Sequence, residues 1–378
     1  MLMMDVGGPA GWDFPTMAAI TLFLAGDVMT GRGIDQILPH PGDHRLRESF
    51  VRDARYYVHA VEERNGPLPR PVPFSWPWGS ALRAIEAAAP SARILNLETS
   101  VTRARAFAPG KPVHYRMRPE NLPAVLAARP DVCVLANNHV LDFGRAGLLE
   151  TLAVLSRAGV RVAGAGHDVA EAASPAVVGT GQTRLAVFAA AASSSGVPAE
   201  WAAGPATPGV RLLDSDAPEL VEQVAAAKRA GHLVLVSLHW GSNWGYGVAS
   251  GQMGFAHRLI DAGADVVHGH SSHHPRPIEV YRGRLVLYGC GDLVNDYEGI
   301  SGFERYRGDL RLLYFPSLDP ETGALLALRM VPVQSRRLRL QRAGSRDEEW
   351  LRSVLTRCST PFGTRVDSVD GVLSLAWR

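Results

Sequence analysis

Four histidines crowd one short stretch of this chain, which reads DVVHGHSSHHP from Asp265 to Pro275. They are His268, His270, His273 and His274. Neutral imidazoles are common ligands of transition metals, and sharing an ion removes the repulsion that charged imidazoles would suffer. A solvated histidine-rich turn is the alternative. Four imidazoles with glycine and serine between them favour a metal site.

The histidine cluster follows an apolar run, residues 264–267, that predicts a short buried strand. Other strand candidates also end in an acid, an amide or an imidazole: Asp27, Glu98, Asn138 with His139, His239, and Asp292. In open α/β sheets ligands bind at the carboxyl ends of the strands, so these groups are expected to share one site. Carboxylates with imidazoles suit a divalent metal, and one carboxylate can bridge two ions. These residue types do not distinguish Zn, Mn, Fe, Ni or Ca, or one ion from two.

Predicted strands and helices alternate along the chain, which favours an α/β architecture. Apolar runs predict strands at residues 20–25, 93–97, 131–136, 160–163, 183–191, 233–238 and 284–288. Helices are expected at residues 82–89, 119–128, 143–158, 216–230 and 252–262. Residues 310–315 and 324–333 predict an antiparallel pair, and the arginine-rich tail after Gln334 predicts one helix near 348–355. The proline-rich stretch 67–79 predicts a loop that presents two tryptophans.

The composition is that of a globular protein with a large core. Its 378 residues are 46% hydrophobic and 20% charged, with a formal net charge of +2. No basic run is long, so neither nucleic acid nor a membrane surface is expected as a partner. The three cysteines are far apart, which is typical of buried thiols in a reducing cytoplasm. No targeting segment or apolar run of bilayer length stands out, so we expect a soluble cytoplasmic protein and leave the oligomeric state open.

Six segments give the chain a specific resemblance. They read FLAGDVMTGRGID, ILNLETSVT, VLANNHVLDFG, GAG, SLHWG and DVVHGHSSHHPRPIEVYRGRLVLYGCGD, and they cover roughly residues 20–295. In this order they resemble the CapA family of calcineurin-like metallophosphoesterase folds. The resemblance implies an α/β sandwich of two mixed β-sheets flanked by helices over residues 18–335. Residues 1–17 would be an N-terminal extension, and residues 336–378 a C-terminal extension packing on the domain.

The same resemblance implies roles for single residues. The metal ligands would be Asp27, Glu98, Asn138, His239, His270 and His273, with His139 as the acid or the group that stabilises the transition state. Phosphoesterases of this fold usually carry Asp-x-His on the first strand, whereas Asp27 is followed here by Val28 and Met29. With one imidazole missing and Glu98 in place of an aspartate, single-metal occupancy becomes plausible. A two-metal phosphoesterase is correspondingly less favoured.

Three functions are compatible with this resemblance. They are capsule or poly-γ-glutamate biosynthesis, soluble phosphoester hydrolysis, and the lasso-peptide epimerase activity of a soluble branch. We favour the epimerase, which would invert Cα of the C-terminal residue of a precursor peptide while a metal stabilises the enolate-like charge. One acid–base side would be His139 with Asp142. The other would lie in the segment 292–298, with Asp296 and with Asn295, which could only orient the substrate.

The predicted peptide site is apolar with a cationic edge. Tryptophans near the strand ends would form its wall: Trp76, Trp78, Trp240 and Trp244. Arg103 and Arg116, from the basic loop 103–118, would approach the peptide carboxylate. Such a pocket suits a bulky apolar C-terminal residue. No motif for pyridoxal phosphate or flavin is visible, so the divalent metal is the expected cofactor.

Overall fold

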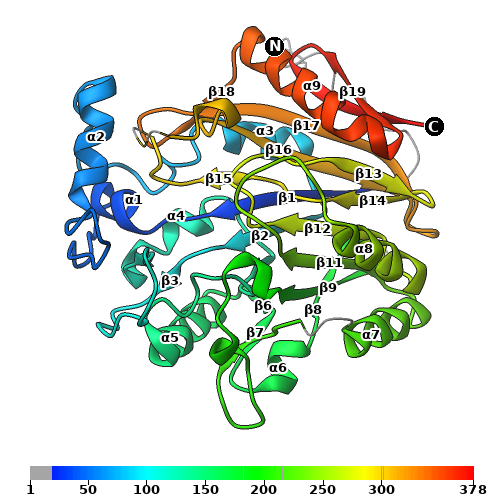
Figure 1. Cartoon of the computed structure of the whole chain (residues 1–378), viewed down its shortest axis with the longest axis horizontal. Helices are drawn as coiled ribbons and strands as arrows, with labels where there is room; N and C mark the ends of the chain where they lie inside the picture. The colour runs from blue at the N-terminus through cyan, green and yellow to red at the C-terminus, as the bar shows by residue number, and fades with distance from the viewer. Residues whose placement is uncertain (1–18, 182, 214–216, 299, 301) are drawn as a thin grey trace, which may run out of the picture.

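The computed structural model describes residues 19–181, 183–213, 217–298, 300 and 302–378. Two β-sheets lie face to face, with helices on their outer sides (Figure 1). The first sheet contains, in spatial order, β19 (Thr364–Val369), β20 (Val372–Trp377), β17 (Leu325–Ser335), β16 (Leu310–Leu318), β1 (Ile20–Val28), β2 (Ala92–Leu97), β5 (Val132–Val134) and β6 (Arg161–Ala163). Beside this row, β15 (Asp292–Val294) pairs with β1, and β18 (Leu340–Arg342) pairs with β17.

The second sheet contains, in spatial order, β13 (Ile278–Tyr281), β14 (Arg284–Leu287), β12 (Val266–His270), β11 (Leu233–His239), β9 (Arg184–Ala191) and β8 (Ala176–Gly179). Both sheets mix parallel and antiparallel neighbours, and β1 contacts β12 across the interface. The predicted sandwich of two mixed sheets flanked by helices is confirmed. Two short pairs lie outside these sheets: β3 (Ser100–Val101) with β4 (Arg116–Met117), and β7 (Ala165–Gly166) with β10 (Gly209–Val210).

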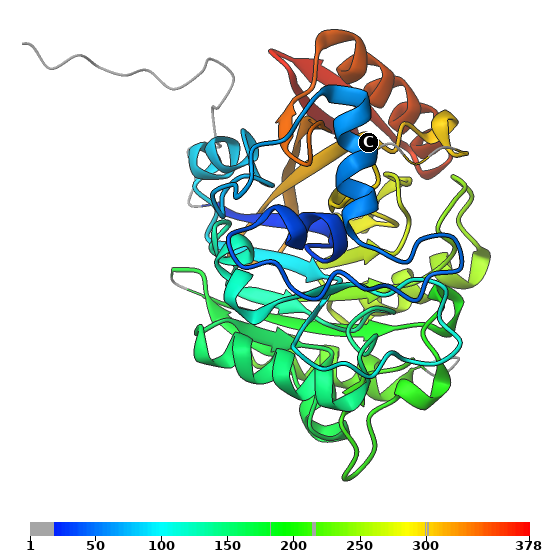
Figure 2. The ribbon, with the colours of Figure 1, turned by 90° about the vertical axis from the view of Figure 1, so that its left-hand side faces the viewer.

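Helices cover both faces of the sandwich. On the first sheet lie α3 (Ala81–Ala88), α5 (Gly144–Arg157) and α9 (Ser345–Ser359), and on the second lie α7 (Pro218–Arg229) and α8 (Ser250–Ala262). The remaining helices are α1 (Arg32–Ile37), α2 (Arg55–Asn65), α4 (Pro123–Leu126) and α6 (Val169–Ala173). Figures 1 and 2 show α1 and α2 on the side toward which β1, β11 and β12 point. No helix in the described ranges is both long and apolar enough to cross a membrane.

Most sequence-based element predictions agree with the structure to within a few residues. β16 and β17 form the expected antiparallel pair, and the helix expected near 348–355 lies within α9. The helix expected at 119–128 is instead a 3₁₀ turn (Pro119–Asn121) followed by α4, which Pro123 begins because it lacks a backbone N–H. Asp216, the expected start of α7, and the predicted extension 1–17 lie outside the described residues. In the predicted extension 336–378, β20 pairs with β17 and so adds strands to the first sheet.

Candidate metal centre

Strand register places the principal candidate ligands in pairs. Asp27 and Asp292 are partners on the parallel strands β1 and β15. Gly26 permits this close approach, since a Cβ at that position would lie 1.7 Å from the carbonyl oxygen of Gly291. His239 and His270 are likewise partners at the ends of the parallel strands β11 and β12. Two carboxylates of one sheet therefore meet two imidazoles of the other.

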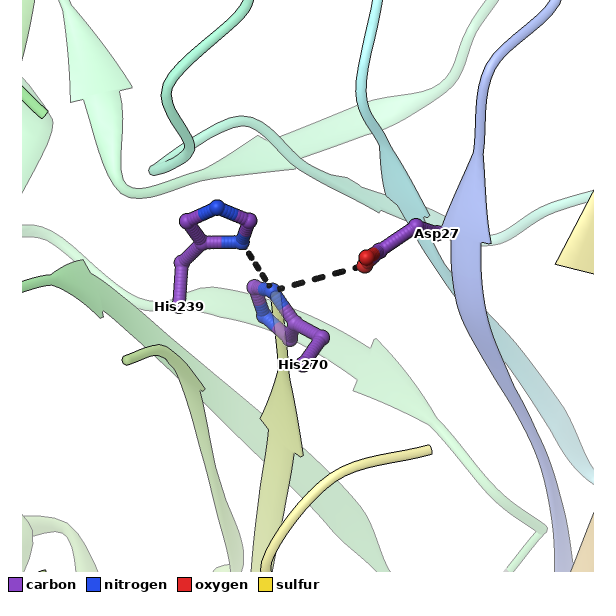
Figure 3. Close-up of side chains that lie close together, drawn as sticks. All are labelled: Asp27, His239 and His270. Atoms are coloured by element: carbon purple, nitrogen blue, oxygen red, sulfur yellow. Dashed lines mark hydrogen bonds and ion pairs between the residues drawn. The ribbon is translucent and has the colours of Figure 1, made fainter. Parts of the chain in front are cut away.

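The first group of ligand atoms comes from Asp27, His239 and His270, and all of them lie within 4.8 Å of one another (Figure 3). The Nδ1 atoms of the two imidazoles are 2.8 Å apart. Nδ1 of His270 is 3.9 Å from Oδ1 of Asp27. All three side chains are buried. A carboxylate with two imidazoles is a donor set typical of divalent transition metals.

Asp27 also belongs to a second group, with His273 and Asp292, whose ligand atoms lie within the same 4.8 Å. Nδ1 of His273 is 2.9 Å from Oδ1 of Asp292. Asp292 was recognised from the sequence as a strand-end acid but was not among the six predicted ligands. Met29, where the resemblance leads one to expect an imidazole, is buried, and the imidazole of the second group comes from His273.

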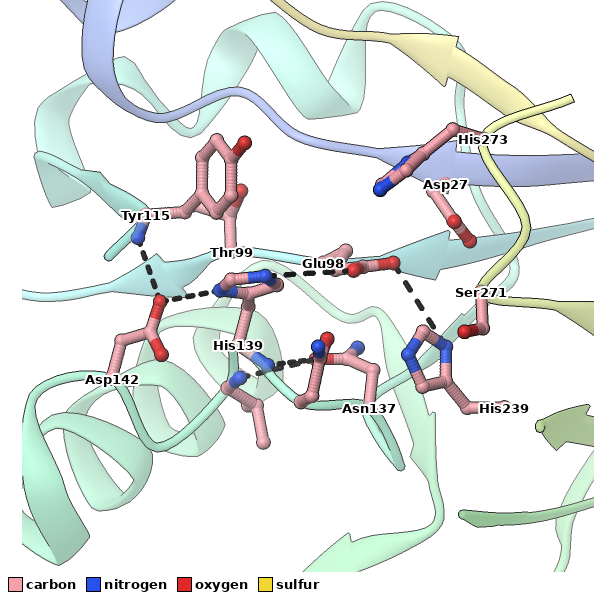
Figure 4. A network of polar contacts seen from close by, with 12 residues as sticks. Asp27, Glu98, Thr99, Tyr115, Asn137, His139, Asp142, His239, Ser271 and His273 are labelled. Carbon is pink, nitrogen blue, oxygen red and sulfur yellow. Dashed lines mark hydrogen bonds and ion pairs between the residues drawn. The ribbon is translucent and has the colours of Figure 1, made fainter. Parts of the chain in front are cut away.

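Glu98 lies between the first ligand group and His139. Its Oε2 is 3.9 Å from Nδ1 of His239, and its Oε1 is 3.8 Å from Nε2 of His139 (Figure 4). The side-chain amide of Asn96 donates to Oδ1 of Asp27 at 2.7 Å and to Oε2 of Glu98 at 3.0 Å. Asn96 thereby holds the carboxylates of two neighbouring strands in place.

Buried polar atoms without partners test whether these residues fit a metal ion. Oδ2 of Asp27, Oδ1 of Asn138 and Nε2 of His239 are buried and have no hydrogen-bond partner in the part of the chain that the structure describes. Burial, with Asp292 close by, raises the pKa of Asp27 to about 7. Burial, with Asp27 close by, raises the pKa of Glu98 well above its ordinary value. A divalent cation would neutralise these acids and supply the missing partners, so the residues fit such an ion.

His139 stands beside the ligand groups in a fixed orientation. Its Nδ1 is 2.7 Å from Oδ2 of Asp142, an oxygen that also accepts the backbone N–H of Tyr115 at 2.7 Å (Figure 4). Nζ of Lys111 is 2.8 Å from Oδ1 of Asp142. Burial raises the pKa of Asp142, but His139 and Lys111 outweigh burial and lower it. The ionised carboxylate can only accept, so Nδ1 carries the proton and Nε2 stays free to act as a base.

Two cavities meet at the candidate metal centre. The larger, of about 790 Å³, is bordered by His273 and Asp292. The smaller, of about 500 Å³, is bordered by Glu98, Asn138, His139 and His239. Val113, His273 and Tyr297 line both cavities. The structure thus brings the six predicted ligands and His139 to one place that is open to ligands from two directions.

Comparison with known proteins identifies the family of this chain. The model of a family described as bacterial capsule synthesis protein PGA_cap matches residues 21–297. The chain belongs to this family. A probable polyglutamine synthesis accessory protein of Mycobacterium tuberculosis is 54% identical over 353 residues, which are 92% of this chain and 93% of that protein. The PGA biosynthesis protein CapA of Bacillus subtilis is 29% identical over 222 residues, 58% of this chain and 56% of that protein. The capsule biosynthesis protein CapA of Bacillus anthracis is 25% identical over 281 residues, 73% and 60% of the two chains.

In this member of the PGA_cap family, Asn295 and Asp296 do not present an acid–base group to the site. Asn295 is 2% exposed and donates to Oδ2 of Asp292 at 2.6 Å. Asp296 is 0% exposed and accepts from Nε of Arg32 at 3.1 Å and from Nη2 at 2.5 Å. The prediction of a catalytic Asp296 is wrong because its carboxylate is buried against this guanidinium. Asn295 orients a candidate ligand, and not a substrate as predicted.

Of the four tryptophans predicted to bind substrate, Trp244 lines the larger cavity. The other three line neither cavity, because Trp78 and Trp240 are buried and Trp76 is partly buried against the core. Trp78 is fully buried and donates to the carbonyl of Ala124 at 2.7 Å. Trp240 is 3% exposed, and its indole N–H donates to the carbonyl of Tyr288 at 3.1 Å. Trp76 packs against the core, and its indole N–H donates to the carbonyl of Arg337 at 3.1 Å.

The two arginines predicted to bind a peptide carboxylate are also occupied elsewhere. Arg103 pairs with Glu120 at 2.5 Å and with Glu150 at 3.1 Å. Arg116 donates to backbone carbonyls at 2.8 and 3.0 Å and lies over the ring of Phe143, 4.5 Å from its centroid. Neither lines a cavity that borders the metal centre. The prediction is wrong because these two guanidinium groups bind acids and backbone carbonyls of the protein and so stabilise the basic loop.

Several residues at the site do not belong to any motif that could have identified them from the sequence. The hydroxyl of Tyr115 donates to the hydroxyl of Tyr297 at 2.6 Å. The ring of Tyr115 lies edge-on to His139 at 4.5 Å, and the ring of Tyr297 is 5.3 Å from His273. The two phenols therefore bridge the acid–base residue and the second ligand group. Lys111 was visible in the sequence only as one cation of a basic loop.

Proposed function

We propose that this protein is a divalent-metal-dependent enzyme that hydrolyses amide bonds of a poly-amino-acid chain during capsule-type polymer synthesis. The observation that carries the proposal is the membership of Asp27 in two overlapping groups of ligand atoms. Asp27 would help to hold an ion in each group, with His239 and His270 in one and His273 and Asp292 in the other, and two ions so held would supply Lewis-acid chemistry. The polymer class comes from relatives whose names refer to polyglutamine synthesis and PGA biosynthesis.

Hydrolysis joins the oxygen of water to the amide carbonyl carbon and breaks the C–N bond. The hydrogens of water end on the new carboxyl group and on the released amine. A bound divalent metal would polarise the carbonyl and lower the pKa of water. Burial lowers the pKa of His139 to about 4 although Asp142 opposes this, so the ring is neutral and Nε2 can accept a proton from water. The same nitrogen then returns the proton to the departing amine.

The test is mass spectrometry of defined oligomers incubated with the full chain. Glutamate and glutamine oligomers are treated with chelated protein and with protein reloaded with Zn or Mn. We expect products heavier by one water in sum, formed only after reloading, and loss of this activity in His139→Ala. His257→Ala is the matched control, because His257 contacts Glu279 at 3.0 Å away from both cavities. Intact oligomers with every metal, together with hydrolysis of bis(p-nitrophenyl) phosphate, would favour the phosphoesterase alternative instead.

Inversion of a peptide Cα stays a prediction. None of the relatives compared above is named as an epimerase, and Asp296 is buried against Arg32, which leaves His139 as the acid–base group on one face. The same incubations in heavy water test it directly. An epimerase would introduce one deuterium at Cα of an uncleaved precursor peptide, whereas the proposed hydrolase would leave every Cα unlabelled.

A further inference from the structure

The larger cavity at the metal centre is lined by a set of arginines, and we call it the arginine cavity. Its volume is about 790 Å³, and its lining includes Arg32, Arg64, Arg307, Arg311 and Arg336. It lies between α2 and the chain that follows β15, and His273 and Asp292 connect it to the metal centre. None of its arginines belonged to the predicted site.

The acids of the arginine cavity accept hydrogen bonds from neighbouring residues of the chain. Glu298 accepts from Nδ2 of Asn65 at 2.5 Å and from the backbone N–H of Leu338 at 3.0 Å. Asp309 accepts from Arg307 at 2.9 Å and from Gln334 at 2.8 Å. Glu304, exposed at the rim, accepts the backbone N–H of Gly302 at 2.8 Å. These carboxylates therefore contribute to the structure of the cavity wall.

The cavity's free capacity lies in its donors. Arg64 and Arg336 are exposed, and neither has a carboxylate oxygen within 4.0 Å among the described residues. Nε of Arg336 donates to Oδ1 of Asn65 at 3.1 Å, which leaves its terminal nitrogens available. Arg311, 1% exposed, lines the cavity with an Nε that has no hydrogen-bond partner in the described part of the chain. A complementary ligand must therefore be rich in acceptors.

Apolar surface at the mouth of the cavity favours ligands that carry apolar groups as well as hydrogen-bond acceptors. Phe50 is 69% exposed, Tyr56 58% and Phe303 44%, and the ring of Phe303 stacks on Trp244 at 3.9 Å. Rings of this kind suit methylene groups between the acceptors. A glutamate chain supplies both features, with a carboxylate, one methine carbon, two methylene carbons and an amide carbonyl in every repeat.

We propose that the arginine cavity binds an acidic poly-amino-acid chain and prefers glutamate to glutamine repeats. The class of polymer in this inference rests on the proposed function. The exposed guanidinium groups of Arg64 and Arg336 make this choice, because they gain a charged partner from a carboxylate and much less from a neutral amide. Val113, His273 and Tyr297, which line both cavities, would let the bound chain continue to the metal centre.

The experiment measures binding and not cleavage. Fluorescently labelled decamers of glutamate and of glutamine, with the same linkage, are titrated against the full chain by anisotropy, first in chelator and then with Zn. We expect about tenfold tighter binding of the glutamate decamer. The double variant Arg64→Ala, Arg336→Ala should weaken it about 3- to 10-fold, as expected for partly exposed charge pairs, while leaving the glutamine decamer unchanged.

Arg365→Ala is the matched control, since Arg365 is an exposed arginine of β19 that does not line the cavity. Equal affinity for the two decamers, or an unchanged double variant, would overturn the inference. So would a single-stranded decanucleotide that binds as tightly as the glutamate decamer, because that result would reflect general attraction of polyanions. Charge-selective binding without cleavage would contradict only the proposed function, and cleavage without charge selectivity would contradict only this inference.

Discussion

The side-chain amide of Asn295 donates a hydrogen bond of 2.6 Å to Oδ2 of Asp292. Nη2 of Arg311 donates in turn to Oδ1 of Asn295 at 2.9 Å, and His273 contacts the other oxygen of Asp292. This buried chain gives Asn295 a role that its chemistry allows, since an amide can orient a carboxylate but cannot act as a base. Burial raises the pKa of Asp292, but His273 and Arg311 outweigh burial and lower it. Asp292 is therefore ionised and ready to bind a cation.

A first prediction is that Asp292→Asn reduces the metal content of the protein. The second ligand group loses a carboxylate, whereas Asp27, His239 and His270 are unchanged. We expect mass spectrometry of the reloaded protein to give one ion fewer than in the parent chain. Asn295→Ala should weaken the same ion about 10- to 100-fold, as is usual when a residue that orients a ligand is lost. Identical metal content in parent and Asp292→Asn would contradict the second group.

At the first ligand group, metal binding should depend on pH through the carboxylate of Asp27 more than through the imidazoles of His239 and His270. The sequence predicts that binding weakens as histidines become protonated near pH 6. In the structure, burial lowers the pKa of His239 and His270 well below the ordinary value, so these rings stay neutral at that pH. The pKa of Asp27 is instead raised to about 7, so its carboxyl group holds a proton below that pH and a cation must displace it.

Affinity for Zn is thus expected to rise as the pH increases through about 7, with protons released on binding below that value. Calorimetry in buffers of different ionisation enthalpy measures the number released. Asp27→Asn removes the titrating group and most of the affinity, so the control is the parent chain at pH 8, where fewer protons should leave. A proton count of zero at pH 6 would show that Asp27 is already ionised in the metal-free protein.

The candidate ligands could be found from sequence because each one follows an apolar strand, and parallel strands bring their carboxyl ends together. This local pattern located Asp27, Glu98, His239 and His270. The same pattern marked Asp292 as a strand-end acid, but not as a partner of Asp27, because that pairing depends on β15 lying beside β1 although the two strands are far apart along the chain. No local periodicity encodes such a pairing.

The predicted substrate pocket failed for a different reason. Apolar composition indicates that a tryptophan will be covered, but it does not say by what. Trp78 is covered by the core, and Trp244 by Phe303 at the cavity mouth. The roles of arginines in the basic loop were equally hidden, because Arg103 is paired to acids from two other segments. Whether an arginine stabilises the fold or binds a ligand depends on acids that lie far from it in the sequence.

A third prediction concerns the orientation of His139. Asp142→Asn replaces an acceptor with an amide that can donate to Nδ1, which would favour the wrong tautomer and place a proton on Nε2. We expect the rate of oligomer cleavage to fall about 10²- to 10⁴-fold while metal content stays unchanged. Glu200→Gln is the matched control, a carboxylate-to-amide change in the lining of the smaller cavity, which His139 also lines. Equal losses in both variants would point to a general effect of charge.

Trp78 offers a prediction about stability. Trp78→Ala removes a fully buried ring and its hydrogen bond to Ala124, so the free energy of unfolding should fall by about 3–5 kcal/mol. Denaturant titration measures this loss. Affinity for the glutamate decamer should not change, because Trp78 lines neither cavity at the metal centre. Weaker decamer binding by a still folded variant would restore Trp78 to the substrate site.

The last prediction concerns the pair of phenols between the two cavities. Tyr115 donates its hydroxyl hydrogen to Tyr297, so the hydrogen of Tyr297 is left to donate elsewhere, and Tyr297 lines both cavities beside His273. Burial raises the pKa of Tyr297 above its ordinary value, so the phenol remains protonated at neutral pH. A donor in this position would stabilise negative charge on the substrate carbonyl oxygen during cleavage.

Tyr297→Phe keeps the ring against His273 and removes only the hydroxyl group. We expect kcat to fall about 10²-fold, KM to change little and the metal content to stay the same. Tyr115→Phe should have a smaller effect, because Tyr297 keeps its own donor and loses only the group that positions it. Tyr281→Phe serves as the control, because Tyr281 is a phenol of β13 that lines neither cavity. A rise in KM without a fall in kcat for Tyr297→Phe would make this residue part of ground-state binding and would leave His139 as the group that acts in the transition state.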